Sequence, residues 1–124
     1  MSERLDVVGI GNAMVDAIIP SNKEEIEKHQ INRDSMNLID EELKNKLHQD
    51  YKIKEMAGGG SLGNSMFGIT SFGGNGSFIG KIKNDEIGVF LQKDMVREGL
   101  KFPLGFTSPD ISTGCCTIFV EEDG

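Results

Sequence analysis

The sequence predicts an α/β protein, because short apolar runs rich in β-branched residues alternate with amphipathic helical segments. The clearest strand covers residues 113–120 and the clearest helix covers residues 85–98. Glycine is concentrated at the junctions: ten of the 16 glycines lie between Gly58 and Gly88. The apolar residues among them argue against a flexible linker, so we expect tight turns and close backbone approaches there. A chain of 124 residues is one domain or part of a larger one.

Composition and charge exclude several classes of protein. The chain has 13 basic and 20 acidic residues, and a net charge of −7 is unfavourable for binding a nucleic-acid backbone. No apolar run approaches the ~20 residues of a membrane span, and the N-terminus has no secretory apolar region. Cys115 and Cys116 are strand neighbours that point to opposite faces, so we expect no disulfide between them. These features predict a soluble, cytoplasmic protein without nucleic-acid or membrane partners.

The first half of the chain predicts a mixture of short elements. We expect strands over residues 5–10, 14–19, 36–39 and 51–56. A short helix over residues 23–29 is expected after Ser21 as its cap, and a second helix follows Asp40, with Leu43 and Leu47 on one face.

The second half has stronger helical signals. We expect helices over residues 61–71 and 85–98, strands over residues 76–82 and 113–120, and a short extended segment over residues 101–104. Asp85 caps the later helix and Gly99 ends it. Asp123-Gly124 after a strand is typical of a hairpin turn, so we expect the chain to be part of a longer protein.

Two alternatives arise for the segment that follows the first strand. Gly9-Ile10-Gly11 resembles the start of a dinucleotide-binding fingerprint, which would indicate a nicotinamide-dependent oxidoreductase. The third glycine position is Met14, however, and the next residues predict a strand, so a plain strand exit also fits. Asn12 and Asp16 lie where open α/β sheets bind ligands, and both side chains can accept hydrogen bonds from sugar hydroxyls.

A second candidate site lies at the start of the helix over residues 61–71. Gly59 and Gly60 precede that helix and Asn64 lies in its first turn, where free N–H groups favour polar or anionic ligands. A purely structural turn with Ser61 as the helix cap fits the same residues. Neither His29 nor His48 has a partner at metal-ligand spacing, so the sequence predicts no metal site.

Taken in order, VVGIGNAMVD, AGGGSLGNS, SFGGNGSFIGKIKNDEIG and STGCCTIFV resemble the N-terminal half of the ribokinase-like (PfkB) carbohydrate kinases. GNAMVD followed by GGSLGNS is most similar to the adenosine-kinase-like branch. Lys83 and Met66 depart from the family pattern, which has Gly and a small residue at these positions.

The resemblance implies a role for each matching position. Asp16 and Asn64 would bind substrate hydroxyls, and Asn12 would lie nearby in the pocket. Gly59 and Gly60 would form a hinge between an α/β body and a β-sheet lid. Cys115 or Cys116, on a lid strand, would line the pocket wall. No catalytic residue is expected in this chain, because the family's catalytic base would lie beyond Gly124.

The same resemblance implies the architecture and the activity. The fold would be the N-terminal part of a three-layer α/β/α body with a small β-sheet lid. Body segments would lie near residues 5–12 and 59–100, and lid segments near residues 13–58 and 101–124. The parent protein would phosphorylate a primary hydroxyl of a sugar or nucleoside such as adenosine, ribose or fructose. ATP and Mg²⁺ would be bound mainly by the C-terminal half, so the isolated chain would be inactive, and lids would pair in a homodimer. A non-catalytic sugar-binding domain is the remaining alternative.

Overall fold

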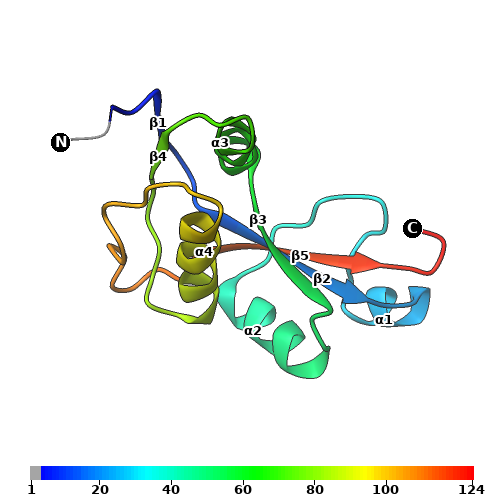
Figure 1. Ribbon diagram of the computed structural model, residues 1–124. Helices are drawn as coiled ribbons and strands as arrows, with labels where there is room; N and C mark the ends of the chain where they lie inside the picture. The colour runs from blue at the N-terminus through cyan, green and yellow to red at the C-terminus, as the bar shows by residue number, and fades with distance from the viewer. Residues whose placement is uncertain (1–3) are drawn as a thin grey trace. The chain divides into compact units, whose positions relative to one another are not determined.

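The computed structural model describes residues 4–124, and Figure 1 shows the helices and strands within them. In chain order they are β1 (Val7–Ile10), β2 (Met14–Pro20), α1 (Lys23–Lys28), α2 (Glu41–Asp50), β3 (Glu55–Gly59), α3 (Ser61–Ser71), β4 (Gly76–Ile79), α4 (Glu86–Arg97) and β5 (Gly114–Val120). The α/β class predicted from the sequence is confirmed.

The chain divides into two compact units. Unit 1 contains the described residues up to Asp16 together with Ala57–Cys116, and unit 2 contains Ala17–Met56 and Thr117–Gly124. β1, β4, α3 and α4 therefore belong to unit 1, and α1 and α2 belong to unit 2. β2, β3 and β5 each continue from one unit into the other, and they form a sheet in the order β3-β2-β5.

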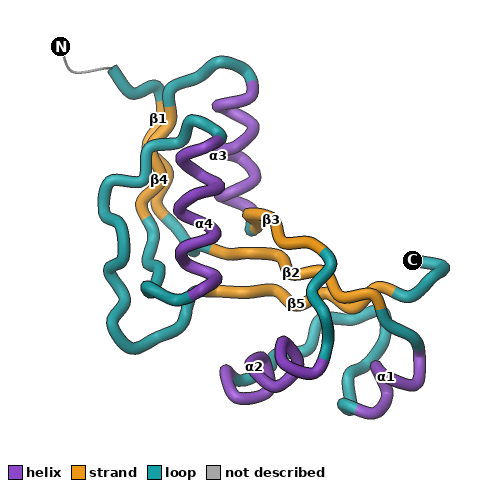
Figure 2. Tube along the Cα trace, turned by 60° about the horizontal axis from the view of Figure 1, so that its bottom comes forward, coloured by secondary structure: helices purple, strands orange, loops and turns teal. Residues whose placement is uncertain are grey.

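Unit 1 is built around the parallel pair of β1 and β4, which is aligned from Val7 opposite Gly76 to Ile10 opposite Ile79. Figure 2 shows α3 and α4 beside these two strands. The buried side chain of Met66, on α3, occupies space that glycines leave open. A Cβ built on Gly9 would lie 2.8 Å from Met66 Sδ, and one on Gly76 would lie 3.0 Å from Met66 Cε. The large residue at position 66 is thus accommodated because Gly9 on β1 and Gly76 on β4 have no side chains.

Helix α4 follows the sequence prediction closely. Asp85 caps it by accepting a hydrogen bond from the amide of Gly88, and Gly99 takes a positive φ of 87° just beyond its end. Of the apolar face that the spacing predicts, Ile87, Leu91 and Met95 are buried and Phe90 is half-buried.

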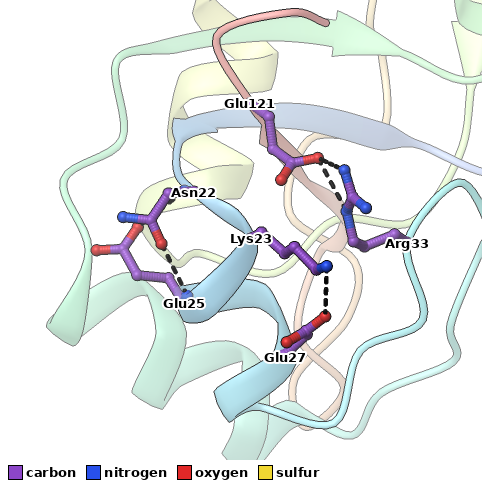
Figure 3. A network of polar contacts seen from close by, with 6 residues as sticks. All are labelled: Asn22, Lys23, Glu25, Glu27, Arg33 and Glu121. Carbon is purple, nitrogen blue, oxygen red and sulfur yellow. Dashed lines mark hydrogen bonds and ion pairs between the residues drawn. The ribbon is translucent and has the colours of Figure 1, made fainter.

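Unit 2 contains the two shorter helices. Asp40 caps α2 as predicted, and Leu47 is fully buried. Figure 3 shows the polar contacts around α1, where Asn22 and Glu25 form a reciprocal capping box. The same view shows Arg33 paired with Glu121 and Lys23 paired with Glu27. The nitrogen–oxygen distances are 2.5 Å in the first pair and 3.8 Å in the second. Ion pairs as exposed as that of Lys23 and Glu27 are worth about 1 kcal/mol or less.

Two predictions in the first half of the chain are wrong. The cap of α1 is Asn22 instead of Ser21, because the amide of Ser21 still bonds to Val120 and keeps that residue extended. Residues 36–39 form no strand. The Asn37 side chain bonds back to the carbonyl of Asn32, and Met36 and Leu38 are 85% and 92% exposed, so the segment has no strand partner.

Three other extended segments have different bounds in the structure from those that the sequence predicts. The strand expected over residues 51–56 instead begins at Glu55 and runs through Gly58 to Gly59, which leaves Gly60 alone as the junction with α3. The strand expected over residues 76–82 ends at Ile79. Beyond it, Ile82 makes a single bridge to Phe106. In the segment over residues 101–104, only Lys101 makes a strand-like bridge, to Ser77.

Candidate functional site

The centre of the candidate site in unit 1 is the contact between Asp16 and Gly59. Asp16 lies on β2 and is half-buried, whereas Gly59 is the buried last residue of β3. A Cβ built on Gly59 would lie 2.5 Å from Asp16 Oδ2 and 2.6 Å from Oδ1. The carboxylate can occupy this place only because residue 59 has no side chain, so the two sequence motifs meet at this point.

Gly60 connects this contact to helix α3. It is the N-cap residue of α3, with a φ of 79° and a ψ of 153°, and no side chain caps the helix. The first turn of α3 contains no acidic residue. The first amides of a helix, before its first intrahelical hydrogen bond, can therefore meet a polar or anionic group here. The alternative with Ser61 as the cap is wrong, because Ser61 is already the first helical residue.

The two asparagines lie on the same two segments. Asn64 is exposed in the first turn of α3, and its amide bonds to the carbonyl of Gly60 at 2.9 Å. Asn12 is exposed in the short connection between β1 and β2, and a Cβ on Gly60 would lie 3.8 Å from its backbone oxygen. The structure thus brings the Asn12 and Asp16 segment together with the Gly59 to Asn64 segment.

The two cysteines lie on β5, which also approaches this region. Both are half-buried and neither forms a disulfide. At the start of β5, a Cβ on Gly114 would lie 2.7 Å from the carbonyl oxygen of Ala13. Burial, and to a smaller extent the negative charge of Asp16, raise the pKa of the Cys116 thiol. Cys116 is therefore protonated at neutral pH, which fits a wall residue better than a nucleophile.

The start of β5 is held by a partly buried polar network that the sequence predicted only in part. Asp85 Oδ1 accepts hydrogen bonds from the Gly88 amide at 2.7 Å and from Thr113 Oγ1 at 2.8 Å, while Asp85 Oδ2 accepts from the Thr113 amide at 3.0 Å. Thr113 Oγ1 also accepts a bond from the amide of Lys83 at 3.0 Å. The Asp85 carboxylate therefore both caps α4 and fixes Thr113, the residue just before β5.

Asp94 is a polar residue of this region that sequence reasoning missed. It lies on the buried face of α4 and is 8% exposed, and its Oδ2 accepts a hydrogen bond from the Gly58 amide at 3.2 Å. Its other oxygen pairs with Arg97. The available signal was its position: Asp94 stands three residues after Leu91, on the apolar stripe of the helix, where a carboxylate is unusual.

The dinucleotide alternative requires a different local structure. A dinucleotide fingerprint needs a helix directly after the glycines, so that its N-terminus meets the pyrophosphate. Here Met14–Pro20 form the strand β2. The site therefore lacks the helix on which that alternative depends.

Other potential functional groups in the described residues have structural partners. His29 Nε2 lies 2.8 Å from the Tyr51 hydroxyl, and His48 Nε2 lies 2.8 Å from Thr117 Oγ1. Within residues 4–124 there is no cluster of three or more His, Cys, Asp or Glu side chains that could hold a metal ion. The helices of this part of the chain are also too short or too polar to cross a membrane.

Comparison with solved structures shows which proteins share this fold. A probable sugar kinase of Rhizobium etli CFN 42 is 34% identical with a TM-score of 0.76, and the adenosine kinase of Sinorhizobium meliloti is 33% identical with a TM-score of 0.79. Each match covers 98% of this chain and 37% of the kinase. The adenosine kinase of Anopheles gambiae, solved with a diadenosine tetraphosphate, is 23% identical over 92% of this chain and 37% of its own, with a TM-score of 0.75. No family model and no curated protein matches.

These matches confirm the predicted fold class. The chain spans about 37% of the length of the kinases that it matches, and the similarity covers nearly all of its own residues. The Rhizobium and Sinorhizobium proteins are almost equally similar to it, although one is described as a sugar kinase and the other as an adenosine kinase. The similarity therefore indicates a kinase relationship without separating the two acceptor classes.

Proposed function

Because the chain is a ribokinase-like (PfkB) kinase chain over nearly its whole length, we propose that the complete protein transfers a phosphoryl group from ATP to a primary hydroxyl of a sugar or nucleoside. This chain supplies the side of the site that binds the acceptor. The observation that carries the proposal is the contact of Asp16 with Gly59 beside the uncapped N-terminus of α3.

The proposed chemistry depends on positioning. Phosphoryl transfer is accelerated mainly by aligning the acceptor with the phosphate and neutralising charge. Asp16 and Asn64 hold the acceptor's hydroxyls, with Asn12 nearby and the backbone of Gly59 and Gly60 as the adjoining wall. Cys115 or Cys116 lines the pocket. Bending at the two glycines closes the lid and excludes water from the reacting groups.

ATP and its Mg²⁺ belong to the proposal but not to these residues. Mg²⁺ prefers carboxylate and phosphate oxygens, and the described residues contain no group of three or more His, Cys, Asp or Glu side chains that could hold a metal ion. Because the chain spans about 37% of the kinases that it matches, we assign the nucleotide, its metal ion and the catalytic base to the part of the protein outside this chain. Pairing of lids in a homodimer stays a prediction, which sedimentation of the complete protein would test.

Substitution of Asp16 in the complete enzyme tests the proposal. Asp16→Asn keeps the size of the side chain but removes its charge, and a charge-assisted hydrogen bond is worth about 1.5–3 kcal/mol. We expect kcat/KM for the acceptor to fall about tenfold or more. The acceptor would first be identified by measuring ATP-dependent phosphorylation across a panel of sugars and nucleosides.

The outcomes separate the candidate functions. Phosphorylation of an acceptor, reduced by Asp16→Asn, supports the kinase. Unchanged kinetics in the variant would show that Asp16 does not bind the acceptor. Binding of sugars by the complete protein without any phosphoryl transfer would instead support the non-catalytic sugar-binding alternative.

A further inference from the structure

We infer that Asp94 is a positioning residue for the acceptor site, because its carboxylate anchors Gly58 and so determines where β3 passes into Gly59, Gly60 and α3. This inference rests on the proposed function and extends it to a residue on α4, outside the segments that carry Asp16 and Asn64. The support consists of the burial of Asp94, its hydrogen bond and the space around Gly58.

Asp94 and Gly58 make a direct contact within unit 1. The Gly58 amide donates to Asp94 Oδ2 at 3.2 Å, and the two residues are 36 positions apart in the sequence. β3 is an outer strand in the order β3-β2-β5. The carboxylate on α4 therefore attaches the end of an outer strand to a helix whose apolar face, at Leu91 and Met95, is fixed in the core.

The space around Gly58 is shaped for this contact. A Cβ built on Gly58 would lie 2.7 Å from the Phe67 ring and 3.0 Å from Asp94 Oδ2. A side chain at position 58 would therefore push away either the carboxylate or the ring. The absence of a side chain allows the strand to approach α4 and α3 closely enough for the hydrogen bond to form.

The charge of Asp94 makes the arrangement costly unless it has partners. The side chain of Asp94 is 11% exposed, and its second oxygen pairs with Arg97, whose side chain is 70% exposed. A nearly buried carboxylate is destabilising unless hydrogen bonds and an opposite charge compensate for its lost hydration. An apolar residue could occupy this position on the buried face of α4 without losing the hydration of a charge. The carboxylate is therefore best explained by its hydrogen bond to Gly58.

Gly58, to which Asp94 is hydrogen-bonded, lies next to the candidate site in the sequence. Gly59, which follows Gly58 directly, is the residue against which the Asp16 carboxylate lies. Gly60 then begins α3, and its carbonyl accepts the hydrogen bond from the Asn64 amide. A shift of Gly58 therefore displaces the backbone that adjoins Asp16 and carries Asn64, and small misplacements of such groups reduce catalysis strongly.

Four variants of the complete enzyme test the inference. Asp94→Ala removes the anchor, and Asp94→Ser removes it while leaving a polar atom in the helix, in case the alanine variant does not fold. Asp94→Asn keeps an oxygen that can accept from Gly58. Arg97→Gln is the matched control, because it removes the ion pair but leaves the bond to Gly58 intact.

The measurements are steady-state kinetics for the acceptor, melting temperature, and hydrogen exchange of the Gly58 amide by NMR on the 124-residue chain. We expect Asp94→Ala and Asp94→Ser to raise KM for the acceptor about fivefold to tenfold, the effect of losing about 1–1.4 kcal/mol of binding. KM for ATP should change less than twofold, and exchange of the Gly58 amide should accelerate. Asp94→Asn and Arg97→Gln should keep KM for the acceptor within about twofold of the unaltered enzyme.

Several results would overturn the inference. A lower melting temperature with an unchanged KM for the acceptor would show that Asp94 only stabilises the fold. Equal increases of KM in Asp94→Ala and Arg97→Gln would assign the effect to the lost ion pair. If the unaltered enzyme phosphorylated no acceptor, the proposed function and this inference would both fail. The exchange of the Gly58 amide reports on the hydrogen bond separately in every case.

Discussion

At the scale of single residues, the candidate site depends on places where a glycine makes room for a carboxylate. Asp16 lies against Gly59, and Asp94 lies against Gly58. In both pairs a Cβ on the glycine would come within 3.0 Å or less of a carboxylate oxygen. Two neighbouring glycines on β3 thus admit two acidic side chains from different elements, and each glycine is required by a contact and not by a turn.

Gly59→Ala is expected to damage the site more than the fold. The added methyl group would collide with the Asp16 carboxylate and move it, so kcat/KM of the complete enzyme should fall about tenfold or more. Gly68→Ala is the matched control, because a Cβ on Gly68 meets no atom within 4 Å and the residue lies in the middle of helix α3, away from the candidate site. That variant should be neutral or more stable by up to about 1 kcal/mol. Kinetics and melting temperatures that are the same for both variants would contradict the assigned role of the Asp16 contact.

At the scale of elements, the junction between β3 and α3 is a single residue. Gly60 has a φ of 79°, which side-chain-bearing residues rarely adopt, and it leaves the N-terminus of α3 without a side-chain cap. The predicted hinge at Gly59 and Gly60 stays a prediction. A turn needs one backbone conformation at this position, whereas a hinge needs two, and the two roles differ in what a substitution changes.

Gly60→Ala distinguishes a hinge from a turn when it is compared with Gly73→Ala. Gly73 also has a positive φ, of 86°, and a Cβ there meets nothing within 4 Å, so both variants should lose about 1 kcal/mol of stability from backbone strain. We expect only Gly60→Ala to change kcat and KM together in the complete enzyme. If melting temperatures fall equally and the kinetics of Gly60→Ala are unaltered, Gly60 is a structural turn only.

At the scale of the whole molecule, the chain corresponds to about 37% of the kinases that it resembles. Its described residues bring together the proposed acceptor-binding groups, but they contain no cluster that could hold a metal ion. The proposal assigns the nucleotide, the metal ion and the catalytic base to other residues. Activity is therefore expected only from the complete protein.

The isolated 124-residue chain is expected to have no kinase activity. Because we assign the base and the nucleotide site to the rest of the protein, ATP turnover by this chain should not depend on any sugar or nucleoside. The measurement is release of ADP by the purified chain with and without each acceptor, compared with a blank lacking protein. Acceptor-dependent turnover above the blank would show that the division of roles between this chain and the rest of the protein is wrong.

The sequence by itself determined the α/β class, helices α2, α3 and α4, and the residue types at the candidate site. These features depend on local interactions: Asp40 and Asp85 cap the helices that directly follow them, and the apolar spacing of each helix sets its buried face. The weaker predictions failed where two local signals competed. Asn22 replaced Ser21 as a cap, and residues 36–39 lacked a partner strand even though their apolar residues favour one.

Only the tertiary structure decided which distant residues meet. Asp94 reaches Gly58 over 36 positions, and Thr113 reaches Asp85 over 28 positions. Asp16 likewise lies against Gly59, although the two belong to separate motifs. A capping signal acts within one turn of a helix and can be recognised locally. A hydrogen bond between distant segments instead depends on the whole path of the chain between them, and no local pattern records that path.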